Sequence, residues 1–294
     1  MKKHLSLIFF SLFYITSFGQ INLEDSTVQA ITYWDNKEVY EYKITNKQTK
    51  LKNNEIVSSD SIAYNVEISV LDSTANSYTV QWLYKSDFHN NLKVIYKIND
   101  LGEFEEVLNL EDIRKFQNNL VNGVLDNAKG NSTDEHLDKI KDNISSIFST
   151  KEAIETIGIK EITQFHMFYG LSYKLGEILE GEIETPNILG SSPFTAKVSV
   201  SLDEIYSDGS YLIGSTQSIS KEQLAAAVLE FAKRISKSAD KPADLSSIEN
   251  MDLENEIATT SEIHNSGWIL YSIQQTTITN GNLKMIKECI IELE

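Results

Sequence analysis

The chain contains a single cysteine, Cys289, among its 294 residues, so it cannot form an internal disulfide. A fold without disulfides has to be stabilised by its core, and a chain of this length can bury one that is large enough. Basic residues are also scarce, since 26 Lys and Arg stand against 43 Asp and Glu. Because nucleic-acid-binding proteins usually carry a basic face, the composition argues against nucleic acid and anionic membrane surfaces as partners.

Glycine-rich phosphate loops and the common catalytic signatures are absent as well. No two of the 13 glycines are separated by a single residue, and neither the dinucleotide fingerprint nor the nucleoside-triphosphate loop can be written in this sequence. The hydrolase motif G-x-S-x-G and the zinc-protease motif H-E-x-x-H are also missing. We therefore expect no cofactor and no enzymatic activity.

Residues that ligate metals or act as nucleophiles occur singly. His89 lies two residues after Asp87, and such a pair can supply two metal ligands but more often lies in a solvated loop. His136 has acidic neighbours, which the dipole of a helix start favours without any metal. Cys289 alternates with apolar residues, as a buried structural thiol does. No metal site is predicted.

Residues 1–19 have the layout of a secretory signal peptide. Two lysines precede a mostly apolar run from Leu5 to Phe18, and Ser17 and Gly19 are the small residues of a cleavage site. The run has about 14 residues, whereas a membrane-spanning helix needs about 20. A retained anchor is the alternative. We expect an exported protein, periplasmic or extracellular, that begins at Gln20.

Alternation of apolar and polar residues predicts about five antiparallel strands between residues 38 and 108. One face of each strand is apolar, which indicates a sheet with one face on a core and the other in water. The turn-rich segment 73–77 and a turn at 100–102 separate neighbouring strands. The strands are expected around residues 40–44, 62–71, 78–85, 94–98 and 104–108.

Apolar residues recur at helical spacing in the middle of the chain and again near residue 230. The first predicted helix begins after Asn109, and the last begins with a capping box from Ser220 to Gln223. Gly158 is expected to bend the third helix, and Gly170 to end it. The four apolar stripes cover residues 113–125, 137–147, 154–165 and 224–235.

Strands return in the second half of the chain. Residues 194–202 alternate, and a turn at Asp208-Gly209 leads into a returning strand. Residues 238–260 are polar and acidic and are expected to form a surface loop. The segments 268–278 and 283–293 are joined by Asn280-Gly281, the strongest short hairpin signal.

The densest aromatic run after the signal peptide is EITQFHMFYG, residues 161–170. On a helix, Ile162, Phe165 and Tyr169 share one face. We expect an apolar helix end buried on the sheet, with His166 at its margin. The alternative is a lining for an apolar ligand. The candidate lining residues are Phe116, Ile162, Phe165, Phe168 and Tyr169.

Four segments together resemble an exported bacterial family of unknown function: VEISVLDSTANSYTVQW, IYKINDLGEFEEVLNLEDI, EITQFHMFYG and SGWILYSI. They span most of the chain after the signal peptide, and the family implies no catalytic residues. The order of the elements also resembles the curved-sheet carriers of lipids and lipoproteins. In those proteins, helices cover the concave side of an antiparallel sheet.

The sequence therefore predicts an α+β fold, in which an extensive, twisted antiparallel sheet is packed on one face by about four amphipathic helices. Residues 20–294 are expected to form one domain, with a division near residue 170 as the alternative. The expected function is non-enzymatic binding of an apolar or amphipathic small molecule between sheet and helices. A cell-envelope structural or protein-interaction module with a filled core is the rival. A hydrolase would need His89, His166 or His264 to converge with carboxylates.

Overall fold

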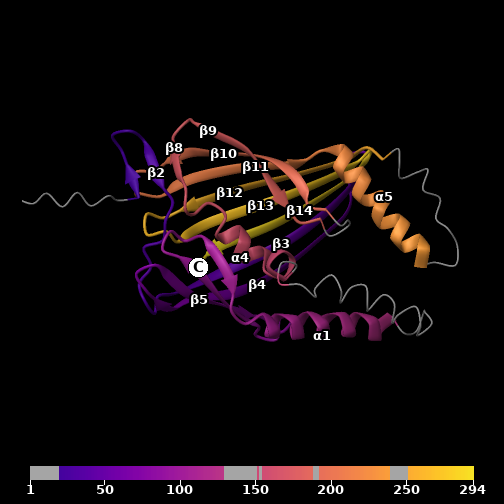
Figure 1. Ribbon diagram of the computed structural model, residues 1–294, viewed down its shortest axis with the longest axis horizontal. Coiled ribbons are helices and arrows are strands. Elements are labelled where there is room, and N and C mark those ends of the chain that lie inside the picture. Colours follow the sequence, from indigo (N-terminus) through magenta and orange to yellow (C-terminus); the bar gives the residue numbers. More distant parts are fainter. Residues whose placement is uncertain (1–19, 129–150, 152–153, 188–191, 239–250) are drawn as a thin grey trace, which may run out of the picture.

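The computed structural model describes residues 20–128, 151, 154–187, 192–238 and 251–294, and strands dominate them. The main element of this part of the chain is an antiparallel sheet of eleven strands (Figure 1). In sheet order the strands are β7 (Phe104–Val107), β6 (Lys93–Asn99), β5 (Ser77–Lys85), β4 (Glu55–Ser73), β3 (Val39–Lys52), β14 (Leu283–Leu293), β13 (Ile269–Asn280), β12 (Leu253–Ile263), β11 (Tyr211–Ile219), β10 (Phe194–Ile205) and β9 (Ile178–Thr185).

The early and late strands form one continuous sheet because β3 pairs with the last strand, β14. Strands from before and after residue 170 therefore lie side by side. A small second sheet consists of β1 (Ile21–Asn22), β2 (Thr27–Gln29) and β8 (Ser172–Lys174).

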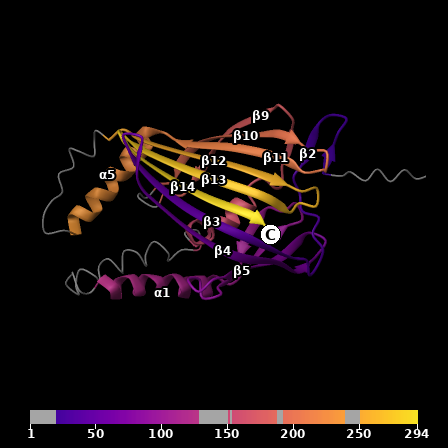
Figure 2. The ribbon, with the colours of Figure 1, turned by 180° about the vertical axis from the view of Figure 1, so that it is seen from behind.

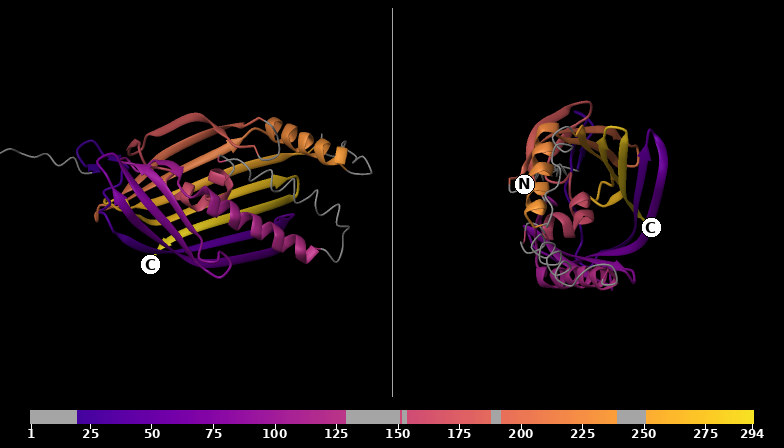
Figure 3. Two further views of the ribbon diagram at one scale, coloured as in Figure 1. Left: turned by 60° about the horizontal axis from the view of Figure 1, so that its bottom comes forward. Right: turned by 90° about the vertical axis from the view of Figure 1, so that its right-hand side faces the viewer.

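Three α-helices and one π-helical turn are present among the described residues. They are α1 (Leu110–Ala128), the turn η1 (Ile154–Gly158), α4 (Lys160–Phe165) and α5 (Lys221–Ser238). Only α4 lies centrally on the sheet, where it contacts β13 and β14. In Figures 1 and 3, α1 and α5 begin beside the strands and extend past the end of the sheet. No helix of the described chain has the length and hydropathy of a membrane span.

The predicted α+β class, with about four helices packed on one face, is therefore wrong. The third predicted helix breaks at Gly158, where η1 ends, and α4 has only six residues. The helix predicted over 137–147 lies outside the described residues. Strands β9 and β12 were also missed, and β12 occupies part of the segment 238–260 that the sequence assigned to a loop.

The other strand and turn predictions are confirmed. Five strands fill residues 39–107, and β13 and β14 form the terminal hairpin, with Gly281 at φ +57°. One half of the predicted capping box forms, because the Gln223 N–H donates to Ser220 Oγ at 3.4 Å, whereas the Gln223 side chain bonds the Thr195 backbone instead of the Ser220 N–H. Local signals were therefore reliable wherever a turn or cap residue fixed the boundary of an element.

The large sheet twists and curls around α4, as the end-on view in Figure 3 shows. We call the face that bears α4 the inner face, and the opposite face, seen from behind in Figure 2, the outer face. Because successive side chains of a strand alternate between faces, the pairing register assigns each strand residue to one of them. Tyr42, Ile44 and Ile291 belong to the inner face beneath α4.

The core lies between α4 and the inner face and is rich in aromatic rings. The Phe165 ring meets the rings of Tyr42 and Trp82 edge-on, with centroids 5.4 and 5.7 Å apart. Trp34 stacks on Trp268 at 4.1 Å. Such rings bury a large apolar area each, so this half of the inner face is filled by side chains.

Candidate functional site

The aromatic run at residues 161–170 forms most of α4 and the turn that follows it, and it is largely buried. Phe116 lies apart from it on α1, where its half-buried ring stacks on His89 at 5.9 Å. The structure thus brings four of the five predicted lining residues together, packed against neighbouring side chains. These four, each at most 3% exposed, are Ile162, Phe165, Phe168 and Tyr169.

His166 lies inside this core, so the prediction that it lies at the margin is wrong. Its Nδ1 is 2.9 Å from the Gly102 carbonyl oxygen, and its Nε2 is 3.0 Å from the Tyr96 hydroxyl. Because a carbonyl oxygen only accepts, Nδ1 carries the proton and Nε2 accepts from Tyr96. Burial lowers the pKa of His166 to about 4. The imidazole is therefore neutral, with both nitrogens hydrogen-bonded.

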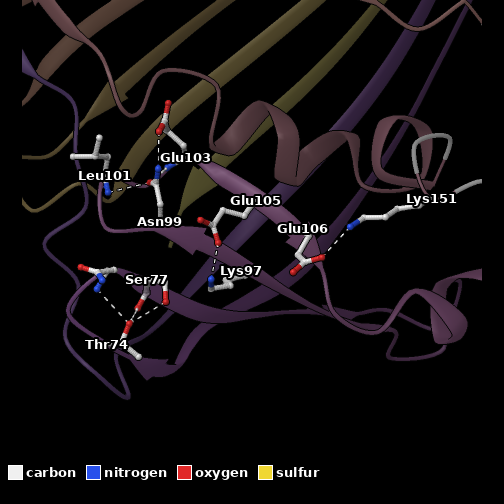
Figure 4. Close-up of polar contacts among 10 residues, drawn as sticks. Thr74, Ser77, Lys97, Asn99, Leu101, Glu103, Glu105, Glu106 and Lys151 are labelled. Atoms are coloured by element: carbon white, nitrogen blue, oxygen red, sulfur yellow. Dashed lines mark hydrogen bonds and ion pairs between the residues drawn. The ribbon is translucent and has the colours of Figure 1, made fainter.

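The Gly102 carbonyl that contacts His166 lies in a turn. The contacts of Asn99 that stabilise this turn are shown in Figure 4. Asn99 Oδ1 accepts from the backbone N–H groups of Leu101 and Glu103 at 3.0 and 2.9 Å. Gly102 has φ +92°, and a Cβ added there would lie 2.7 Å from Thr32 Cγ2. Only glycine fits this position without strain.

Glu161 is a second buried polar residue on α4. Tyr64 and Tyr84 donate to its two carboxylate oxygens at 3.1 and 3.4 Å, and Lys160 Nζ lies 3.7 Å away. Burial, together with the nearby carboxylate, raises the pKa of both phenols, so they remain donors. Desolvation lowers the pKa of His89, whose ring stacks on Tyr84 at 4.5 Å. Hydrogen bonds thus stabilise the buried carboxylate.

Gln164 attaches α4 to the centre of the sheet. Its Nε2 donates to Ser272 Oγ at 2.9 Å and to the carbonyl oxygen of Cys289 at 3.2 Å. Ser261 donates in turn to Ser272 at 2.8 Å.

Cys289 is buried as predicted, and burial raises the pKa of its thiol to about 12. A thiol with this pKa is a packing group rather than a nucleophile.

Beyond α4 the inner face continues with apolar side chains. The register places one apolar residue from each of five strands in line across the sheet. We call these five residues the apolar row. They are Met285, Ile278, Ile219, Ala196 and Ile183, and Asn255 of β12 lies between Ile278 and Ile219. The first three are half-buried, Ala196 is buried and Ile183 is 41% exposed. Ile257 lies beside the row on the inner face.

Charge is divided unequally between the two faces of the sheet. In β9, β12 and β14 every glutamate falls on outer-face positions, as Glu182, Glu256 and Glu288 illustrate. From β9 across to β14 and β3, the inner-face positions of the described strands hold no carboxylate. Their only charged residues are Lys50, Lys52 and Lys287.

A hollow of about 420 Å³ opens on the inner face beside the end of α4. Lys160 and Lys287 both line it, together with Asn46, Gln48 and Asp60. Lys160 Nζ lies 3.3 Å from Asn46 Oδ1. Within the described part of the chain, Lys287 has no ion-pair partner. The hollow therefore presents two ammonium groups one position away from the apolar row.

The start of α5 is fixed to the sheet close to the other end of the apolar row. The Gln223 side-chain amide bonds both the N–H and the carbonyl of Thr195, at 2.8 and 2.9 Å. Lys221 pairs with Asp252 and Glu254 at 2.8 Å each. These contacts hold the first turn of α5 between β10 and β12, and its Ala227 side chain is buried.

A larger hollow, about 920 Å³, lies at the opposite end of the molecule beside the small sheet. Its lining includes Leu23, Tyr33 and Leu175, which are 77%, 49% and 41% exposed. Gln20 closes one side, where its Oε1 accepts from the Tyr211 hydroxyl at 3.1 Å. This end combines exposed apolar groups with a concave surface.

The described histidines lie in separate places. His89 bonds Ser86 through Nδ1 at 2.7 Å, and His264 bonds Ser266 through Nδ1 at 2.8 Å. Among the residues that the structure describes, no group of three His, Cys, Asp or Glu side chains is placed to hold a metal ion.

Comparison with known proteins identifies no family for this chain. No family model matches the chain, and no curated protein matches it in sequence. Among solved structures, it is similar to a lipovitellin chain whose structure is titled "Lipid-protein interactions in lipovitellin". The TM-score is 0.45 and the identity 11%, over 88% of this chain and 25% of that chain. This chain thus spans about a quarter of the lipovitellin chain, and so distant a likeness carries no functional inference.

Proposed function

We propose that this protein is a binding protein for an apolar or amphipathic small molecule, held on the inner face between the apolar row and α5. The observation that carries the proposal is the partial exposure of Met285, Ile278 and Ile219 on the part of the inner face beyond α4. Half-exposed aliphatic side chains on a concave face favour an apolar occupant, since covering them gains about 25 cal/mol per Å².

The proposal places the ligand on different residues from the aromatic run. Phe165 and Tyr169 already contact neighbouring rings and backbone in the core, so we assign them a packing role. Leu224 and Val228 of α5 are half-buried and are expected to cover the bound molecule. The anchored first turn of α5 sets the distance between helix and sheet.

We also propose that the protein is not an enzyme. His166 uses both ring nitrogens in hydrogen bonds to Tyr96 and Gly102. Glu161 is likewise engaged by two phenols. Neither group is available to a substrate without breaking buried hydrogen bonds, which costs about 1–3 kcal/mol each.

The binding proposal is tested by purifying the full-length protein from an expressing bacterium by gel filtration and extracting it with organic solvent. Mass spectrometry is expected to detect an amphiphile at close to one per protein. Nile red binding is then compared in Ile278→Asp and in the control Thr277→Asp, which changes the outer face of the same strand. We expect only Ile278→Asp to lose dye binding. Ligand-free protein, with equal dye binding in both variants, would contradict the proposal.

Export is a further part of the proposed function and is supported by the layout of residues 1–19. Expression of the whole chain with fractionation of the culture is expected to place the protein outside the cytoplasm. N-terminal sequencing is expected to begin at Gln20. A cytoplasmic protein that retains Met1 would refute export and leave the binding proposal standing.

A cell-envelope interaction module is the second candidate. The exposed Leu23, Tyr33 and Leu175 around the 920 Å³ hollow favour it, because such apolar patches often mark protein contacts. Cross-linking in intact cells is expected to give a discrete adduct that Leu23→Asp abolishes. An adduct pattern unchanged by Leu23→Asp would count against this candidate.

A further inference from the structure

If the protein binds an apolar or amphipathic molecule as proposed above, the charge pattern of the inner face indicates that this molecule carries a negative charge. The chain as a whole has a net charge of −17, yet its carboxylates in β9, β12 and β14 face outward. The inner face of the same strands is neutral except for lysines. An anion that approaches this face meets positive groups without the repulsion that the outer face would exert.

Two of these positive groups converge on the 420 Å³ hollow. Lys287 reaches it from β14, and Lys160 reaches it from the start of α4. Lys160 is shared with Glu161 and Asn46, whereas Lys287 has no described ion-pair partner. Two carboxylates line the hollow: Asp60, which the register places on the inner face two strands from Lys287, and Glu288, which belongs to the outer face. Of the two lysines in the hollow, Lys287 is therefore the one without an ion-pair partner among the described residues.

The hollow and the apolar row adjoin one another in the register of the sheet. Lys287 and Met285 are inner-face neighbours on β14, and Met285 begins the row that continues through Ile278 to Ile219. Three strand spacings of about 4.8 Å separate Met285 from Ile219, about 14 Å in all. A single acyl chain spans about half of a hydrocarbon core of about 30 Å. The part of the row from Met285 to Ile219 is thus about as long as one such chain.

We infer that the ligand is a single-chain amphiphile with an anionic head, a carboxylate or a phosphate. The head binds Lys287 and Lys160 in the hollow, and the chain lies along the apolar row beneath α5. The adjoining amides of Asn46 and Gln48 supply further hydrogen-bond donors to the head.

The test measures displacement of Nile red, an uncharged dye, from the whole protein by four competitors: laurate, dodecyl phosphate, dodecanol and inorganic phosphate. Laurate and dodecyl phosphate are expected to compete at concentrations about tenfold below dodecanol at low salt, and to lose that advantage in 0.5 M salt. Inorganic phosphate alone is expected not to displace the dye.

Substitutions of Lys287 test whether this lysine binds the anionic head of the ligand. Lys287→Gln is expected to weaken laurate binding about fivefold and to leave dodecanol binding unchanged. Lys287→Arg is expected to restore laurate binding to the wild-type level. The matched control is Lys284→Gln, on the outer face of the same strand. Lys287 is exposed, so its replacement leaves the core intact.

The outcomes separate this inference from the binding function on which it rests. Equal competition by laurate and dodecanol overturns the anionic head and leaves an apolar binding protein. Failure of every twelve-carbon competitor overturns both. A laurate preference that survives Lys287→Gln, or that Lys284→Gln weakens equally, refutes the assigned lysine. Displacement by inorganic phosphate at laurate-like concentrations shows a free-anion site and overturns the amphiphile.

Discussion

The buried histidine on α4 makes stability depend on pH in a window that the structure defines. His166 is 5% exposed, and its neutral ring donates to Gly102 and accepts from Tyr96. A proton added at Nε2 would remove the acceptor of the Tyr96 hydroxyl and place a charge in the aromatic core. The experiment therefore lowers the pH and compares the wild type with His166→Gln, whose side chain at position 166 cannot take up a proton.

The magnitude follows from the difference in pKa between the two states. Burial lowers the pKa of His166 in the folded protein to about 4, from 6.5 in the unfolded chain. The unfolded state therefore takes up the proton first as the pH falls. The contribution of His166 is complete above pH 6.5 and is lost between pH 6.5 and about 4. At about 1.36 kcal/mol per pH unit, the loss reaches roughly 3 kcal/mol.

The assay is urea unfolding of the wild type and His166→Gln at steps from pH 8 to pH 4. Carboxylates contribute equally to both proteins, so the difference between their unfolding free energies isolates the histidine. We expect this difference to change by roughly 3 kcal/mol across the window. Tyr96→Phe is the control, because it keeps the titrating ring and should lower stability by about 1–3 kcal/mol at every pH. Parallel pH profiles for wild type and His166→Gln would refute the reasoning.

Three further predictions concern the same core. Gly102→Ala should lower the free energy of unfolding by about 1–3 kcal/mol in urea, because Gly102 has φ +92° and a Cβ there meets Thr32; an unchanged midpoint would contradict this. Phe165→Ala should cost about 3–5 kcal/mol, since its ring is 1% exposed, and a loss below 1 kcal/mol in thermal unfolding would show a loosely packed site. Cys289, whose thiol pKa is raised to about 12 by burial, should resist a thiol reagent at pH 8 in the native protein and react in urea; rapid native labelling would disprove its burial.

The strands could be predicted from the sequence where alternation was strong and a turn residue marked the boundary. The hairpin at Asn280-Gly281 and the strand Ser77–Lys85 are examples. β12 was missed because its outward positions are acidic and its inward positions include Asn255 and Thr259. Such a strand is polar on both faces over part of its length, so it resembles a loop until its neighbours in the sheet are known.

The helices were overestimated because an apolar stripe shows that a segment is amphipathic and does not show what covers it. Ile154, Ile162 and Phe165 of the predicted stripe are buried, but Gly158 divides the segment into η1 and the six-residue α4. His166 was assigned to the margin from helical geometry, although the helix ends at Phe165 and the chain turns His166 inward. Its partners are 64 and 70 residues away in sequence, a distance at which periodicity carries no information.

The candidate site was beyond prediction for a related reason, because it arises from the order of strands in the sheet. In the sequence, Ile278 and Ile219 alternate with polar neighbours, and Met285 lies between Lys284 and Ile286, so no local signal marks the three as a group. They form one row only because β14, β13, β12 and β11 pair in a particular register, and a slip of one residue would turn each to the outer face. The same register turns Lys287 inward and Glu288 outward. The carboxylates of β9, β12 and β14 thus belong to the outer face, while a ligand at the apolar row is expected to encounter lysines and aliphatic side chains. The net charge of the whole chain therefore does not by itself argue against an anionic ligand on the inner face.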